Sequence, residues 1–234
     1  MARQLAEGLW MLDLGLMPPI ATNGYLIDDG DAVTLIDPGL MWNRPSLGSE
    51  LAAAGYGVED LTRVLVTHYD LDHSGGLRAL TGYDGPVYMG AEDVALATRA
   101  ADPDLLHPKG LFHRVARRFY GLPDGLDVRE VGDGDVVGKF RAYHTPGHNP
   151  GHTIFVHESG VAFLGDLVWE SDGELTPPFW LDSYDMRAVR ESIRDAAERV
   201  QNFEIAAIAH GSPLTSDGDD ALRSLARRLA DEDR

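Results

Sequence analysis

The chain has 234 residues, of which 44% are hydrophobic and 25% charged, a composition typical of a folded globular protein. Its net charge of −18 argues against a nucleic-acid partner, because binding to a phosphate backbone requires a basic surface. The absence of cysteine excludes disulfides, cysteine nucleophiles and thiolate metal ligands.

No apolar run approaches the roughly 20 residues that are needed to span a bilayer, and the N-terminus lacks the pattern of a signal peptide. We therefore expect a cytoplasmic protein without a membrane partner. The basic residues include only two lysines, Lys109 and Lys139. An acidic, lysine-poor composition is typical of proteins from salt-loving organisms, although a GC-rich genome alone would also replace lysine with arginine.

The first part of the chain has short apolar strands separated by turns. The segment Asp28-Asp29-Gly30-Asp31 predicts a hairpin turn between two of these strands. Glycines at positions 55 and 57 predict the end of the first helix. In chain order, we expect strands at 10–14, 24–28 and 32–37, a helix at 46–55, a strand at 64–66, a helix at about 76–80, a strand at 86–89, and helices at 92–100 and 111–120.

The second half returns to strands and closes with two helices. Two strand-rich halves, each followed by helices, suggest an internal pseudo-repeat in which sheet packs on sheet with the helices outside. No segment has the composition of a linker, so we expect one domain over residues 1–234. The expected elements are strands at 127–131, 140–144, 153–157 and 161–164, a helix at 186–200 with Asp185 as its N-cap, a strand at 205–209 and a helix at 218–229.

A cluster of ligand-type side chains directly follows the strand predicted at 64–66. His68, Asp70, Asp72 and His73 place two imidazoles and two carboxylates within six positions. Imidazole suits zinc, iron and manganese, whereas carboxylates favour harder ions and can bridge two of them. A polar turn after a strand would explain the serine and glycines that follow, but not four ligand-type side chains. The segment therefore predicts a metal site.

Three later segments also end apolar strands with ligand-type residues. His148 lies in a loop rich in glycine and proline, Asp166 follows the strand at 161–164, and His210 follows the strand at 205–209. Each residue alone could satisfy the amides of a turn. Four such segments together favour a metal centre, since side chains at strand ends meet where the strands leave the sheet.

In these motifs the chain resembles the metallo-β-lactamase superfamily over nearly its whole length. The shared features are the HxHxDH motif, a later histidine, a bridging aspartate and a final histidine. The resemblance implies an α+β fold, a four-layer αββα sandwich of two mixed β-sheets with helices outside, and a site for two divalent metal ions. It implies as ligands His68 and His148 for the first ion, Asp72, His73 and His210 for the second, and Asp166 as the bridge between them.

One position departs from the family motif, because Asp70 stands where the family has its second histidine. Asp70 either ligates the first ion through its carboxylate or is too short to reach it. Zinc is the metal that the resemblance implies, but an additional oxygen ligand would shift the preference toward iron or manganese. The flavodiiron proteins are similar in placing a carboxylate here, but they carry a flavodoxin domain for which this chain has no room.

The resemblance implies a metal-dependent hydrolase, in which a hydroxide at the binuclear site attacks an ester, lactone, thioester or related small-molecule substrate. Two alternatives stay open: an iron-dependent oxidoreductase with oxygen or sulfur chemistry, and a non-catalytic member that binds a ligand. Asp72 is expected either to transfer a proton during catalysis or to act only as a ligand. The oligomeric state is also open, with a homodimer as one alternative.

Further side chains are assigned by their place in the sequence. Trp169, Phe179 and Trp180 are expected to wall an apolar substrate pocket, with core or dimer packing as the alternative. His144 and His152, which flank His148, are expected to form supporting hydrogen bonds or to pack the loop.

The helix predicted at 111–120 has a basic face and an apolar face. We expect the basic face to be solvated, with an anion-recognising lid as the alternative. The basic face comprises His113, Arg114, Arg117 and Arg118, and the apolar face comprises Phe112, Val115 and Phe119.

Overall fold

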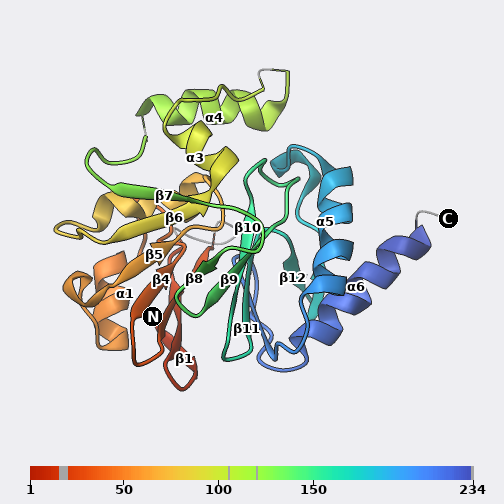
Figure 1. Cartoon of the computed structure of the whole chain (residues 1–234), viewed down its shortest axis with the longest axis horizontal. Coiled ribbons are helices and arrows are strands. Elements are labelled where there is room, and N and C mark those ends of the chain that lie inside the picture. The colour runs from red at the N-terminus through yellow and green to blue at the C-terminus, as the bar shows by residue number, and fades with distance from the viewer. Residues whose placement is uncertain (16–20, 105, 120, 233–234) are drawn as a thin grey trace.

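The computed structural model describes residues 1–15, 21–104, 106–119 and 121–232. Two mixed β-sheets pack against each other and helices cover their outer faces, which is the predicted four-layer αββα arrangement (Figure 1). Within these described ranges, no helix is both long and apolar enough to cross a membrane.

The first sheet has seven strands in the order β1 to β7. Strands β1 to β4 pair in antiparallel fashion, and β4 to β7 are parallel. Ends of parallel strands that point the same way meet at one edge of a sheet, which is where the predicted ligands begin. The strands are β1 (Arg3–Ala6), β2 (Leu9–Asp13), β3 (Asn23–Asp28), β4 (Val33–Ile36), β5 (Arg63–Leu65), β6 (Pro86–Gly90) and β7 (Asp127–Val131).

The second sheet has five strands in the order β14-β11-β10-β9-β8, and only its β11–β14 pair is parallel. A separate two-stranded hairpin, β12 and β13, is formed by residues that lie between β11 and β14 in the chain. The strands are β8 (Val136–Val137), β9 (Phe140–His144), β10 (Thr153–His157), β11 (Val161–Gly165), β12 (Trp169–Ser171), β13 (Glu174–Thr176) and β14 (Ile205–Ile208).

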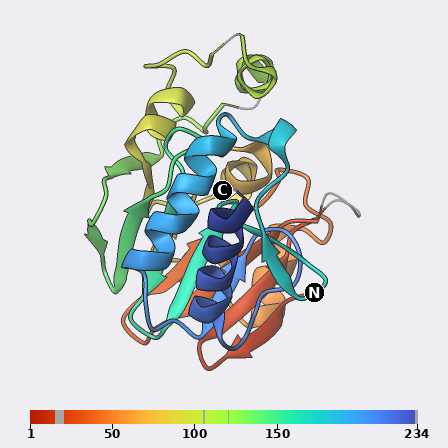
Figure 2. The same cartoon turned by 90° about the vertical axis from the view of Figure 1, so that its right-hand side faces the viewer.

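Helices α1 and α3 lie on the outer side of the first sheet, and α5 and α6 cover the second (Figures 1 and 2). Ser46 caps α1, and Asp185 caps α5 by accepting hydrogen bonds from two backbone amides, as predicted. The α-helices are α1 (Leu47–Ala54), α2 (Leu71–Ser74), α3 (Ala91–Ala97), α4 (Pro108–Phe119), α5 (Met186–Arg199) and α6 (Gly218–Glu232), and the 3₁₀ turns are η1 (Val58–Asp60), η2 (Gly75–Ala79) and η3 (Trp180–Asp182).

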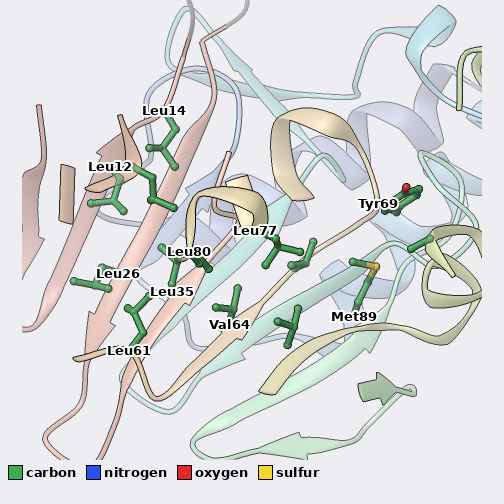
Figure 3. Close-up of a cluster of buried hydrophobic side chains, with 14 of the residues drawn as sticks. Leu12, Leu14, Leu26, Leu35, Leu61, Val64, Tyr69, Leu77, Leu80 and Met89 are labelled. Carbon is green, nitrogen blue, oxygen red and sulfur yellow. The ribbon is translucent and has the colours of Figure 1, made fainter. Parts of the chain in front are cut away.

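Three apolar layers hold the sandwich together. The layer between the first sheet and its helices includes Leu26, Leu35 and Val64 from the strands and Leu77 from η2 (Figure 3). Phe140, Phe155 and Phe163 belong to the layer between the sheets, and α5 and α6 supply the third layer. Each fully buried leucine or phenylalanine contributes roughly 1.5–3 kcal/mol, so the layers fix the sheet edge that carries the ligand cluster.

The helical turns after β5 begin earlier than predicted. The sequence predicts a helix from about residue 76, whereas α2 begins at Leu71 and η2 ends at Ala79. Asp70 precedes α2, and its carbonyl oxygen accepts bonds from the Ser74 amide and hydroxyl. Asp72 and His73 therefore lie within a helical turn, which fixes the direction of both side chains. The predicted end of the α4 helix, Tyr120, lies outside the described residues.

Gly76 lets this turn pack directly against the loop after β4. Its amide donates a hydrogen bond of 2.6 Å to the Gly39 carbonyl, and a Cβ added at Gly76 would collide with the Pro38 carbonyl oxygen. We expect Gly76→Ala to lower the free energy of unfolding by about 2–3 kcal/mol, since overpacking against a backbone atom cannot be relieved by a rotamer change. Urea unfolding measures this effect. Gly48→Ala is the matched control, because a Cβ there meets nothing within 4 Å in the described structure, and equal losses in both variants would contradict the explanation.

Candidate metal centre

The structure brings all seven predicted ligands together at one edge of the sandwich. Both sheets contribute, because the segments after β5, β9, β11 and β14 end at the same place. Their action as ligands stays a prediction, but their convergence is observed. The seven are His68, Asp70, Asp72, His73, His148, Asp166 and His210.

The ligand atoms form two main groups, which we name the first and second positions. The first position is lined by His68, His148 and Asp166, whose ligand atoms lie within 4.8 Å of one another. The second is lined by Asp72, His73 and His210 within the same limit.

Asp166 lies between the two positions. Its Oδ2 is 3.4 Å from His148 Nε2 and 3.3 Å from His210 Nε2. Its Oδ1 is 3.7 Å from His73 Nε2. The carboxylate therefore faces both positions, which is the arrangement that a bridging ligand requires.

The donor atoms fit a divalent metal ion. Among the described residues, His68 Nε2, His73 Nε2 and Asp166 Oδ1 are buried and have no hydrogen-bond partner. Buried polar atoms normally form hydrogen bonds, so three neighbouring ligand-type atoms without one indicate space for a cation. Imidazole nitrogens and carboxylate oxygens are ligands of zinc, iron and manganese.

Each of the four histidines has a partner on its other ring nitrogen. His68 Nδ1 lies 3.0 Å from Thr67 Oγ1, His148 Nδ1 lies 3.2 Å from Ser183 Oγ, and His210 Nδ1 lies 2.9 Å from the Ala21 carbonyl. When Nδ1 donates in these contacts, the lone pair on Nε2 is left facing the metal position.

Asp37 orients the fourth histidine and was not singled out from the sequence. His73 Nδ1 donates to Asp37 Oδ2 at 3.0 Å, and the Thr67 amide and hydroxyl donate to the same carboxylate at 2.8 and 2.7 Å. The available signal was its position directly after the apolar strand β4, which is the same signal that identified Asp166. Asp37 thus links the end of β4 to the cluster after β5.

The electrostatics of the second position favour a positive charge. Burial opposes the charged form of His73, but Asp37, Asp72 and Asp166 outweigh it and raise the pKa to about 9. Burial likewise opposes the charge on His210, and Asp166 and Asp72 raise its pKa to about 11. Without a metal ion, both imidazoles carry the positive charge that these carboxylates require.

At the first position, the shifts favour a neutral imidazole and an ionised carboxylate. Burial, and then the neighbouring His73, lower the pKa of His68 to about 4, so this ring is neutral near pH 7. Burial raises the pKa of Asp166, but His210 and His73 outweigh it and hold that pKa well below its usual value. His68 is therefore ready to ligate without losing a proton.

These shifts predict how pH affects the metal-free protein. Because the folded-state pKa values of His73 and His210 lie above the unfolded value of about 6.5, their stabilisation is complete below pH 6.5. It is lost as pH rises through 9 and 11, at roughly 1 kcal/mol per pH unit and group. Urea unfolding at pH 6, 8 and 10 with a chelator measures this slope.

The metal-loaded protein is the control for that prediction. Metal binding requires unprotonated imidazole, so affinity increases with pH and binding releases protons. We expect zinc to reduce or reverse the loss of stability at high pH. A chelated protein whose stability is unchanged from pH 6 to 10 would contradict the assigned charges.

His152 contacts Asp166 and is not among the residues that line the two positions. Its Nε2 accepts a hydrogen bond of 3.1 Å from the Asp166 amide, and its Nδ1 lies 2.8 Å from Thr145 Oγ1. His144 is 30% exposed and its Nε2 lies 2.9 Å from the Pro150 carbonyl. Both contacts agree with the supporting and loop-packing roles expected from the sequence.

Helix α4 is oriented differently from the prediction. The sequence predicts a solvated basic face, and Arg114 and Arg118 are exposed as predicted. His113 and Arg117 of that face are buried instead, whereas Phe112 and Val115 are more than half exposed. These two buried side chains have partners that periodicity cannot reveal. His113 Nε2 donates to Asp70 Oδ1 at 2.7 Å, and Arg117 donates to the Ala101 carbonyl and to an aspartate carboxylate.

Helix α4 also supplies a buried lysine that the sequence interpretation missed. Lys109 Nζ lies 2.8 Å from Asp70 Oδ2 and 2.8 Å from His148 Nε2. A buried lysine requires a paired environment. The signal in the sequence was the spacing of Lys109 and His113, which are four residues apart and therefore share one helix face.

Two of the three predicted pocket aromatics are exposed. Phe179 and Trp180 are 50% and 65% exposed, and their ring centroids lie 5.8 Å apart. The Trp169 ring packs edge-on against His210 at 5.0 Å, and its Nε1 has no hydrogen-bond partner within the described structure. Trp169 therefore lies beside the second position. Phe179 and Trp180, at the start of η3, lie at the protein surface.

Comparison with known proteins agrees with this geometry. A family model described as the metallo-beta-lactamase superfamily matches residues 17–211. The probable metallo-hydrolase YybB of Bacillus subtilis is 27% identical over 200 residues, covering 79% of this chain and 80% of that protein.

Two further relatives match over part of their length. The hydroxyacylglutathione hydrolase of Maricaulis maris is 29% identical and covers 62% of this chain, and the chain spans 47% of it. The atrochrysone carboxyl ACP thioesterase of Aspergillus fumigatus is also 29% identical and covers 63% of this chain, which spans 29% of that protein.

Solved structures show the same fold. A metallo-beta-lactamase family protein of Thermus thermophilus superposes with a TM-score of 0.71 at 24% identity, covering 97% of this chain and 81% of that one. The metallo beta lactamase from Hirschia baltica gives 0.70 at 18% identity, covering 98% and 97%. With the match of the family model over most of the sequence, the chain belongs to the metallo-β-lactamase superfamily and is a metallohydrolase of that fold.

Proposed function

We propose that this protein is a metal-dependent hydrolase that acts on an ester, lactone, thioester or related small-molecule substrate. The observation that carries the proposal is the set of buried ligand-type atoms that make no hydrogen bond in the described structure, on His68, His73 and Asp166. Their convergence on two adjoining positions supports metal binding better than a structural role, because a structural cluster would pair its polar atoms.

We assign Asp72, His73 and His210, together with Asp166, to a divalent ion in the second position. Zinc is the metal we propose, since these residues offer imidazole nitrogens and carboxylate oxygens, a set that zinc accepts. When bound, the ion supplies Lewis acidity and lowers the pKa of water toward neutrality. His68, His148 and Asp70 line the first position beside it.

Asp72 is the residue to which we assign proton transfer. Its side chain is 25% exposed, against 2% for Asp166 and 9% for Asp70, so it is the most accessible carboxylate of the cluster. The Thr22 hydroxyl donates to its Oδ2 at 3.1 Å, which fixes that oxygen. Burial opposes ionisation, but His73 and His210 lower its pKa to about 2. With this pKa, Asp72 would pass a proton on to a leaving group and would not retain it.

The substrate would meet an apolar surface next to the site. Phe179, Trp180 and Leu181 are exposed around η3, and Phe112 and Val115 are exposed on α4. An acyl chain would bury such side chains, which gives the proposal a preference for substrates with an apolar acyl part. The related thioesterase and hydroxyacylglutathione hydrolase support a thioester as the first class to test.

The iron-dependent alternative has less support. It requires Asp70 as an additional oxygen ligand, but both Asp70 oxygens accept hydrogen bonds, from His113 and Asn149 at Oδ1 and from Lys109 at Oδ2. No observation in the described structure favours redox chemistry over hydrolysis.

A matched panel of chromogenic thioesters, esters and lactones tests the proposed function. We expect turnover by zinc-loaded protein, its loss on chelation and its return when zinc is restored. Thioesters with a longer acyl chain should have lower KM values than acetyl thioesters. A metal-loaded, folded protein that turns over none of these substrates would support the non-catalytic alternative.

A further inference from the structure

Lys109 reaches the first position from helix α4 and contacts His148, one of the residues that line it. Its three donor hydrogens have three acceptors, which are Asp70 Oδ2 at 2.8 Å, His148 Nε2 at 2.8 Å and the Asp182 carbonyl at 2.7 Å. The side chain is 2% exposed. An ammonium group has three donors and no acceptor capacity, so its bonding is complete at this place.

The lysine uses the atoms that a metal ion would need there. His148 Nε2 is a ligand atom of the first position, and it accepts a hydrogen bond from Lys109. Asp70, His148 and Asp182 also bring potential ligand atoms within 4.8 Å of one another. Lys109 Nζ contacts the Asp70 carboxylate and His148 Nε2 of this group, and the backbone carbonyl of Asp182, so the ammonium uses two of the ligand atoms that a cation would need there.

Asp70 is surrounded by donor side chains, and its Oδ2 also lies 3.1 Å from His148 Nε2 and 3.3 Å from His68 Nε2. Its Oδ1 accepts from His113 Nε2 at 2.7 Å and from Asn149 Nδ2 at 2.9 Å, and its Oδ2 accepts from Lys109. The Tyr184 hydroxyl lies 3.1 Å from His113 Nδ1 and continues the network. The Lys109 ammonium therefore supplies the positive charge that balances the Asp70 carboxylate. A neutral histidine at this position would not need such a charge.

The charges balance with one metal ion. The carboxylates of Asp70, Asp72 and Asp166 face the two positions and carry three negative charges. One divalent ion in the second position and one ammonium in the first neutralise them. A second divalent ion would lie next to the ammonium, and like charges in a buried site repel strongly.

We infer that the Lys109 ammonium takes the place of the first metal ion, so that the protein binds one divalent ion, in the second position. This inference rests on the proposed metal-dependent function and replaces the two ions expected from the sequence. His68 then holds no ion, and its Nε2 lies 3.3 Å from Asp70 Oδ2.

Metal content of the full-length protein tests the inference. The protein is loaded with excess zinc, freed of unbound metal, and measured by elemental analysis and native mass spectrometry. We expect one zinc per chain in the unaltered protein. His68→Ala should retain that ion, whereas His73→Ala should lose it.

A second variant pair tests the role of the lysine itself. Lys109→Met combined with Asp70→His removes the ammonium and restores the family's histidine, so we expect the zinc content to rise from one to two per chain. Lys139→Met is the matched control, because Lys139 is the other lysine of the sequence and binds the carboxylates of Asp29 and Asp31. It should keep one zinc.

Three outcomes would overturn the inference while leaving the proposed function intact. They are two zinc ions in the unaltered protein, loss of the ion in folded His68→Ala, or one zinc in a folded double variant. Circular dichroism confirms folding in each case. No zinc in the unaltered protein would instead contradict the proposed metal-dependent function.

Discussion

Replacing His73 with alanine should remove the divalent ion of the second position and lower kcat/KM by at least about 10³-fold, equivalent to about 4 kcal/mol. His73 Nε2 is fully buried, lacks a hydrogen-bond partner among the described residues and faces Asp72 and Asp166 at 3.8 and 3.7 Å. Its removal takes away one of the imidazoles that would hold the ion together with these carboxylates. Zinc content and thioester turnover are measured on the same preparation.

The matched control for this prediction is His144→Ala. His144 ends β9, four residues before His148, but its ring is partly exposed and contacts the Pro150 carbonyl and Glu92. We expect zinc content and turnover to change by less than about twofold in this variant. Full activity in zinc-free His73→Ala would show that the hydrolysis proceeds elsewhere in the molecule.

The sequence was sufficient to bring the candidate ligands together because the topology places strand ends at one edge. β5, β11 and β14 are short apolar runs, and each is followed within a few residues by a ligand-type side chain. Once the strands pair in two packed sheets, their ends lie close together at one edge of the sandwich. His68, Asp166 and His210 therefore follow from one rule, without knowledge of any side-chain contact.

The same rule fails for residues that come from helices and hairpins. Lys109 reaches the site from α4, and its direction depends on how that helix is rotated against the rest of the chain. The pattern of polar and apolar residues predicts that Phe112 is buried and that His113 is exposed to solvent, because polar residues normally lie on the solvated face of a helix. The buried acceptor Asp70 reverses this preference.

Short paired strands were also missed. β12 and β13 have only three residues each, too few to show alternation. Their turn, Asp172-Gly173, is a hairpin signal that could have revealed them. The β12 strand matters for the site because its Trp169 packs against His210.

The second large prediction concerns Asp37 and its effect on metal affinity. Asp37 contacts His73 at Nδ1, the ring nitrogen that faces away from the metal positions. We expect Asp37→Asn to weaken zinc binding by roughly 10–100-fold, the usual effect of removing a carboxylate that supports a metal-bound histidine. The asparagine can keep a hydrogen bond to the Thr67 amide, but it removes the charge that faces His73 Nδ1 at 3.0 Å. Chelator competition measures the zinc affinity.

Asparagine is the suitable replacement because Asp37 has a positive φ of 50°. Asparagine tolerates this left-handed conformation better than alanine does, so backbone strain contributes little to the result. Asp127→Asn is the control, since Asp127 is an exposed carboxylate paired with Arg129 and is not among the residues that line the metal positions. If both variants bind zinc as tightly as the unaltered protein, then Asp37 does not tune the metal position and the orientation of His73 must be fixed by the turn of α2 alone.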